Sequence, residues 1–354
     1  SACTVPSPTM ASMGLWEGDT SPTRLQRMYT NTAGEFTPRA YCTSFFALLA
    51  ATLAGLRLLG RLTDTLGGEP LLQPWWTATT QAYPWMLGHA GFGALVAFAA
   101  FVASCAYFTS LDLRHSVETK VQKQYFPSVR EMLVAGVPQC AIYAAANYVW
   151  YFHGYQPVEL PAHAPSVARL AEQVLVAFVA GDFFIYWEHR LMHRFRFTRV
   201  HIHSWHHAYT APFSWAGGVV HPLEDLVVVA CQVSAPLALG HHPLAFWIFV
   251  ALWTVLLIEE HSGHDVPWAP YNWMPFTRSP MGGGAAPHDI HHYKVTKNFA
   301  FVLCVWDHLF DTFEPVVVPP NLPNWLRPEA AARDKLSPAA FATLAAAEKR
   351  AKPL

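Results

Sequence analysis

The chain has 354 residues, of which 53% are hydrophobic and only 13% are charged, and its formal net charge at pH 7 is −1. A soluble domain usually has about 25% charged residues, so this composition argues against an ordinary water-soluble protein. The sequence has neither an excess of positive charge nor a nucleotide-binding glycine motif, so we expect no nucleic-acid partner. The composition instead predicts a protein that is partly embedded in lipid.

Four long apolar stretches follow a polar, proline-containing segment at residues 1–43. They cover residues 44–60, 85–111, 132–152 and 170–187, and each approaches the roughly 20 residues that a helix needs to cross a bilayer. The buried core of a soluble protein would explain one such stretch. Four of them, together with the low charge, predict that residues 44–187 form a transmembrane region of about four helices.

A fifth apolar region, residues 223–258, is interrupted by Pro236, Gly240 and Pro243. Proline and glycine end helices, so this region predicts two shorter helices that form a re-entrant hairpin and return to their own side of the membrane.

The positive charges of the connecting segments indicate how the helices are oriented. Residues 1–43, 112–130 and 189–221 contain three, four and four Lys or Arg residues, whereas residues 61–84 and 153–169 contain one each. Positive residues collect on the cytoplasm-like side of a membrane protein. The N-terminus, the segment after the fourth helix and the C-terminal third are therefore expected on that side.

Eight histidines form three short motifs within about a hundred residues, one HxxxH and two HxxHH: His189 and His193; His203, His206 and His207; His288, His291 and His292. On a helix, residues three or four positions apart share a face, so each motif can direct its rings to one point. One ion accepts roughly four to six donors, so eight imidazoles fit two ions. Unrelated histidines would explain one motif more easily than three, and the sequence therefore predicts a two-metal site.

The sequence thus predicts an all-α integral membrane protein. Residues 188–315 are expected to form a histidine-rich metal-binding domain on the positive-inside face, with the hairpin 223–258 inserted in it. Residues 316–354 are expected to form a proline-rich linker and then an amphipathic helix.

Several motifs carry a family resemblance. They are residues 182–193 (DFFIYWEHRLMH), 202–213 (IHSWHHAYTAPF), 221–224 (HPLE), 261–267 (HSGHDVP) and 306–312 (WDHLFDT). In order and spacing, residues 178–315 resemble the fatty acid hydroxylase and sterol desaturase superfamily of membrane proteins, and within it the 4-methylsterol monooxygenases.

The resemblance implies a non-haem di-iron centre that uses O2 to hydroxylate or desaturate a sterol or fatty-acyl lipid. Electrons would come from NAD(P)H through a cytochrome b5-type donor, and zinc could replace iron in a purified sample. The eight motif histidines match the family's ligand positions, and His261 matches a ninth, although a helix-capping role would explain His261 equally well. Residues expected to support these ligands, or to lie beside them, are Asp182, Glu188, His221, Glu224, His264, Asp289 and Asp307.

Two other functions remain open at this level. Two-metal hydrolysis also needs converging ligands, and a structural subunit of a larger membrane complex could retain the fold of an enzyme family. The resemblance implies an endoplasmic reticulum location. A mitochondrial inner-membrane location, with the histidines facing the matrix, satisfies the same charge rule.

Overall fold

In the computed structural model, the described part of the chain comprises residues 38–65, 70–122, 125–153, 158–266, 268–269 and 283–314, without the side chains of residues 150 and 151. Within these residues the assigned elements are helices and short helical turns, apart from isolated β-bridge residues such as Lys120 and His264, which pair with each other. The all-α prediction is therefore confirmed. The expectations for residues 1–37 and 315–354 lie outside the described residues.

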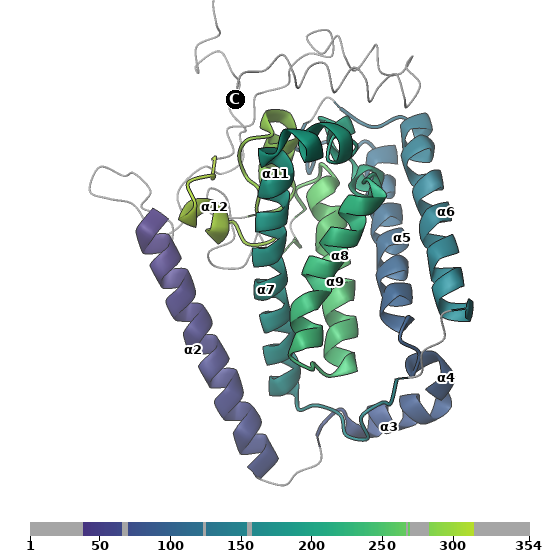
Figure 1. The fold of residues 1–354 in the computed structure, drawn as a ribbon, viewed down its shortest axis with the longest axis vertical. Coiled ribbons are helices and arrows are strands. Elements are labelled where there is room, and N and C mark those ends of the chain that lie inside the picture. Colours follow the sequence, from purple (N-terminus) through teal and green to yellow (C-terminus); the bar gives the residue numbers. More distant parts are fainter. Residues whose placement is uncertain are drawn as a thin grey trace, which may run out of the picture.

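Six long helices form a bundle (Figure 1): α2 (Pro38–Thr65), α5 (Phe92–Leu113), α6 (Val129–His153), α7 (Val167–Arg194), α8 (Pro222–Ala238) and α9 (Pro243–His261). Helix α7 packs against α2, α8 and α9, and α5 packs against α6 and α9. Many large apolar side chains remain exposed on the outside, including Leu58 on α2 and Leu226 on α8, which are 60% and 68% exposed. Such a surface is stable in lipid but not in water.

Five of these helices are long and apolar enough to cross a membrane: α2, α5, residues Val129–Val149 of α6, α7 and α9. The first four correspond to the four predicted spans. The fifth, α9, is the second arm of the predicted hairpin, whose first arm is the 17-residue helix α8. The chain turns between the two arms at Gly240, whose φ of +60° suits glycine, and Pro243 begins α9. The protein is an integral membrane protein with a helical hairpin after its fourth long helix.

The connecting segment between the first two predicted spans, residues 61–84, is largely helical. Helix α2 continues to Thr65, and α3 (Gln73–Ala82) and α4 (Pro84–Leu87) follow at the far end of the bundle (Figure 1). Trp76 of α3 is 1% exposed and packs against Trp247, with the ring centroids 6.0 Å apart. Helix α3 has only 10 residues and is too short to span a membrane.

Short elements collect at the opposite end of the bundle, where α7 and α9 finish (Figure 1): the π-helix Thr198–Ile202, the 3-10 helices His206–Ala208 and Ser214–Gly218, α11 (Ala285–Lys294) and α12 (Val305–Leu309). The start of α2 reaches the same end, because the rings of Tyr41 and His308 are 4.9 Å apart. The start of α2, the loop after α5 and the histidine motifs thus share one end of the bundle, as the charge pattern predicted.

Candidate metal centre

Nine buried histidines gather in two groups at this end of the bundle. All nine are at most 8% exposed, and within each group the possible ligand atoms lie within 4.8 Å of one another. The five-histidine group contains His189, His193, His203, His207 and His291, and the four-histidine group contains His206, His261, His288 and His292. The structure therefore brings together all eight motif histidines and the ninth candidate, His261.

The two groups share the two HxxHH motifs. In each of these motifs the first and last histidines enter one group and the middle histidine enters the other. We expected each motif to point at one site; this holds for His189 and His193 but was wrong for the two HxxHH motifs, because adjacent residues on a helix diverge by about 100°. The second motif is also not a regular α-helix, since His207 has non-helical dihedral angles within a short 3-10 turn. The split links the two groups through the same short segments.

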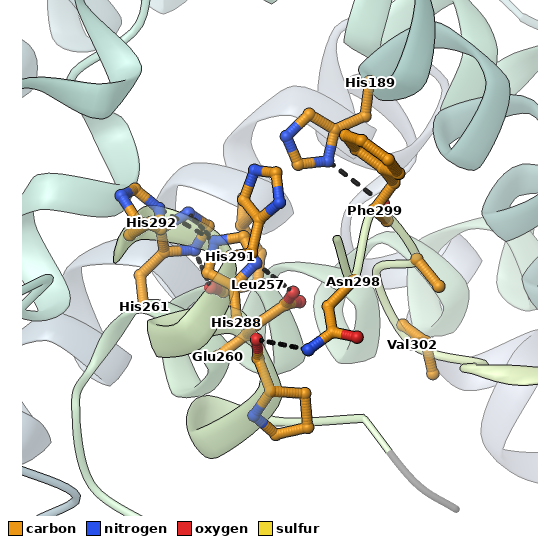
Figure 2. Close-up of polar contacts among 12 residues, drawn as sticks. His189, Leu257, Glu260, His261, His288, His291, His292, Asn298, Phe299 and Val302 are labelled. Carbon is orange, nitrogen blue, oxygen red and sulfur yellow. Dashed lines mark hydrogen bonds and ion pairs between the residues drawn. The ribbon is translucent and has the colours of Figure 1, made fainter. Parts of the chain in front are cut away.

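Backbone carbonyls orient four of the rings. In each case the ring Nδ1 lies at hydrogen-bonding distance from a carbonyl oxygen: His189 from Phe299 (3.0 Å), His261 from Leu257 (2.7 Å), His291 from Lys297 (2.7 Å) and His292 from Tyr209 (2.9 Å). A carbonyl oxygen only accepts, so Nδ1 must donate its proton, and the Nε2 atom of the neutral ring keeps a free lone pair. Figure 2 shows one of these contacts, between His189 and Phe299.

A buried carboxylate orients one more ring, and a second buried carboxylate lies close to another. Glu224 Oε1 lies 2.5 Å from His203 Nδ1, and Glu260 Oε1 lies 2.7 Å from His288 Nδ1 (Figure 2). Glu224 was among the predicted supporting residues, but Glu260 was not. The sequence did contain a signal for it, because Glu260 lies near the end of an otherwise apolar spanning helix, where an acid usually has a functional partner.

The nitrogen positions fit metal ions. Neighbouring Nε2 atoms lie 2.8 to 3.1 Å apart in the five-histidine group and 2.9 to 3.2 Å apart in the four-histidine group. Burial, and then the neighbouring histidines, hold the pKa values of His206, His288, His291 and His292 well below the usual 6.5, which favours neutral rings. Neutral rings whose lone pairs face one another repel unless a cation lies between them. Imidazole suits iron, zinc and copper.

Asp182 supports the site from α7 without touching a histidine of either group. It is 0% exposed and accepts hydrogen bonds from Val302 N (2.5 Å), Leu303 N (3.0 Å) and Trp306 Nε1 (2.7 Å). Instead of holding a histidine ring, as the sequence suggested, this carboxylate fastens the segment before α12 to α7.

Asp307 fixes the same segment from the other side. Its carboxylate accepts hydrogen bonds from Phe299 N (2.9 Å), Ala300 N (2.8 Å) and Thr312 Oγ1 (2.7 Å). The carbonyl of Phe299 is the acceptor for His189 Nδ1. Asp182 and Asp307 therefore act on the five-histidine group through the backbone.

The other predicted supporting residues lie around the groups. Glu188 is buried, and its Oε1 has no hydrogen-bond partner among the described residues. The Nδ1 atom of His221 caps the first turn of α8. His264 binds Asp112 near the end of α5 and Thr119 in the loop that follows, Asp289 binds Gln122 in the same loop, and neither belongs to a histidine group.

Comparison with known proteins places the site within one family. Residues 174–312 match the protein family described as Fatty acid hydroxylase, and this range contains all nine histidines. No solved structure matches the chain significantly.

Relatives with described activities also match the chain. A very-long-chain aldehyde decarbonylase of Oryza sativa subsp. indica is 36% identical over 151 residues, which cover 42% of this chain and 54% of that protein. A methylsterol monooxygenase of Arabidopsis thaliana is 30% identical over 223 residues, or 60% of this chain and 70% of that protein. A cholesterol 25-hydroxylase-like protein of Danio rerio is 29% identical over 248 residues, or 68% and 97%. The chain spans about half the length of the first of these relatives.

Proposed function

Because the chain belongs to the fatty acid hydroxylase family, we propose that it is a membrane-bound oxygenase that oxidises a C–H bond of a sterol or fatty-acyl lipid. The observation that carries this proposal is the convergence of nine buried histidines into two groups, with nitrogen lone pairs facing one another. A protein with a purely structural role would have no need for two complete donor sets.

Two iron ions would occupy the two groups, one in each. When bound, they supply the activation of O2 that the oxidation of an unactivated C–H bond requires. Zinc would fit the same nitrogen donors but has no redox chemistry. Electrons would come from NAD(P)H through a cytochrome b5-type donor, and the endoplasmic reticulum is the proposed compartment.

The chain's own residues would orient the ligands and exclude water. Glu224 would hold the His203 ring in one orientation, Glu260 lies close to the His288 ring, and both carboxylates are almost completely buried. His189 and His193 lie in the last two turns of α7 and His261 ends α9, so both spanning helices deliver ligands directly at their ends. A lipid substrate would therefore need to extend only a short distance from the bilayer to reach the site.

Metal content tests the proposal. The gently purified chain should contain about two irons by elemental mass spectrometry. His206→Ala and His291→Ala should each reduce iron, because each removes a ligand from a different group. His241→Ala is the matched control, since His241 lies at the opposite end of the bundle.

Activity tests the chemistry itself. Protein reconstituted with NADPH, a cytochrome b5-type donor, its reductase and membrane lipids should form an oxygenated or desaturated lipid that depends on O2. Wild-type protein that holds no metal and co-purifies with a fixed set of other chains would contradict the proposal and support a structural subunit.

A further inference from the structure

A buried ion pair lies beside the four-histidine group and contributes no ligand to it. Lys120 Nζ lies 2.6 Å from Asp112 Oδ1, and His264 Nε2 lies 3.0 Å from the same oxygen. All three side chains are at most 1% exposed. Lysine is almost never fully buried unless it is paired, because removing its charge from water is costly. Lys120 can therefore be buried here only because Asp112 compensates its charge.

The backbone around Lys120 pairs with the segment that follows His261. Lys120 and His264 form an antiparallel bridge, and two hydrogen bonds flank it: Val121 N donates to Gly263 O (2.9 Å), and Asp265 N donates to Thr119 O (2.7 Å). Gly263 has a φ of +67°, and a Cβ atom there would lie 2.8 Å from Pro212 O. The chain can thus turn sharply after α9 and lie against the loop that contains Lys120.

The same loop also holds α11. Two residues after Lys120, the amide of Gln122 donates to both oxygens of Asp289, at 2.6 and 2.7 Å. Asp289 follows His288 directly on α11. A single short loop therefore binds both the end of α9 and the start of α11.

These two elements supply three of the four histidines in the four-histidine group, namely His261, His288 and His292. In the five-histidine group, by contrast, four of the members come from α7 and residues 203–207. Its carbonyl acceptor at Phe299 is fixed by Asp307. Only His291 of the five-histidine group lies on α11, so the loop after α5 supports mainly the four-histidine group.

We propose that Lys120 is a positioning residue for the four-histidine group. Its charge compensates Asp112, and its backbone pairing with residues 263–265 fixes where His261 presents Nε2 to His288 and His292. Lys120 acts through these contacts and is not itself a ligand. The inference rests on the proposed metal binding.

The test is a metal-affinity measurement on the full chain in detergent. Lys120→Met removes the charge and keeps the apolar part of the side chain. Competition with a chelator for bound iron then measures the iron affinity of each histidine group. In this titration, the phase of iron release that His261→Ala removes belongs to the four-histidine group, and the phase that His203→Ala removes belongs to the five-histidine group. The affinity of the four-histidine group should fall about 10- to 100-fold, as is typical when a residue behind a ligand is lost, and the five-histidine group should keep its affinity.

Arg57→Met is the matched control, because it removes the cation of the Arg57–Glu172 pair, far from the histidines. It should change neither affinity. Asp112→Asn combined with Lys120→Met removes both buried charges and should restore most of the affinity of the four-histidine group, which a general loss of stability would not allow.

Equal weakening of both groups by Lys120→Met, or no change in either, would overturn the positioning role. If Lys120→Met does not fold, Gln122→Leu takes its place, because it removes the donors to Asp289 and keeps the ion pair. Because α11 also carries His291, a larger loss of affinity in the four-histidine group than in the five-histidine group would again support the inference. Wild-type protein without metal would overturn both proposals, whereas two metals bound with wild-type affinity in the variants would overturn the positioning role alone.

Discussion

Replacing Asp182 by alanine should destabilise the fold strongly. The substitution leaves the donors of Val302, Leu303 and Trp306 buried without an acceptor. Each unsatisfied buried donor costs about 1–3 kcal/mol, and breaking a buried charged network costs about 3–5 kcal/mol, so we expect a loss of about 4 kcal/mol in the free energy of unfolding. With a shift of about 2–4 °C per kcal/mol, the unfolding temperature should fall by roughly 10 °C.

Thermal unfolding of the metal-free protein in detergent, followed by tryptophan fluorescence, measures this shift. Asp64→Ala is the control, since Asp64 is an exposed acid near the end of α2 and should change the free energy by no more than about 0.5 kcal/mol. The unfolding temperature of Asp182→Asn should lie between those of the wild type and Asp182→Ala, because the amide keeps one acceptor but turns its NH2 group towards existing donors. If Asp182→Ala unfolds within about 2 °C of the wild type, the buried carboxylate does not hold this segment as argued.

Two further results are expected. A Cβ atom at Gly217 would lie 3.0 Å from His261 Cβ and Cγ, so Gly217→Ala should release metal from the four-histidine group first; Gly55→Ala, which meets nothing within 4 Å, is the control, and equal retention by both variants would contradict the contact. The metal-free protein should lose stability as the pH falls below about 6.5, because burial holds the pKa values of histidines such as His288 and His292 below those in the unfolded chain, which then binds more protons. An unfolding temperature that stays constant between pH 7 and 5 would contradict this.

The HxxxH and HxxHH motifs predicted eight of the nine histidines that the structure brings together, because they are local patterns on or near helices, and the family resemblance supplied His261. It did not predict how the motifs divide between two groups, since that depends on the tertiary direction of each ring. The role of Lys120 was also hidden. From the charge pattern, Lys120 was expected to be a surface residue on the cytoplasm-like side, yet it is only 2% exposed. Its partner Asp112 lies near the end of α5, where the sequence gives no sign of a buried partner. A buried ion pair between distant segments leaves no periodic signal in a sequence.

The position of α11 in the chain determines when the centre can form during synthesis. A chain released up to residue 282 carries six of the nine histidines and lacks His288, His291 and His292, so each group is incomplete. The acceptors at Lys297 and Phe299 emerge later still. Domains generally fold from the N-terminus as they are made, so the membrane helices would already be in place before either group is complete. Ions would therefore be captured late, by a chain whose last described segment closes over the ends of helices that are already inserted.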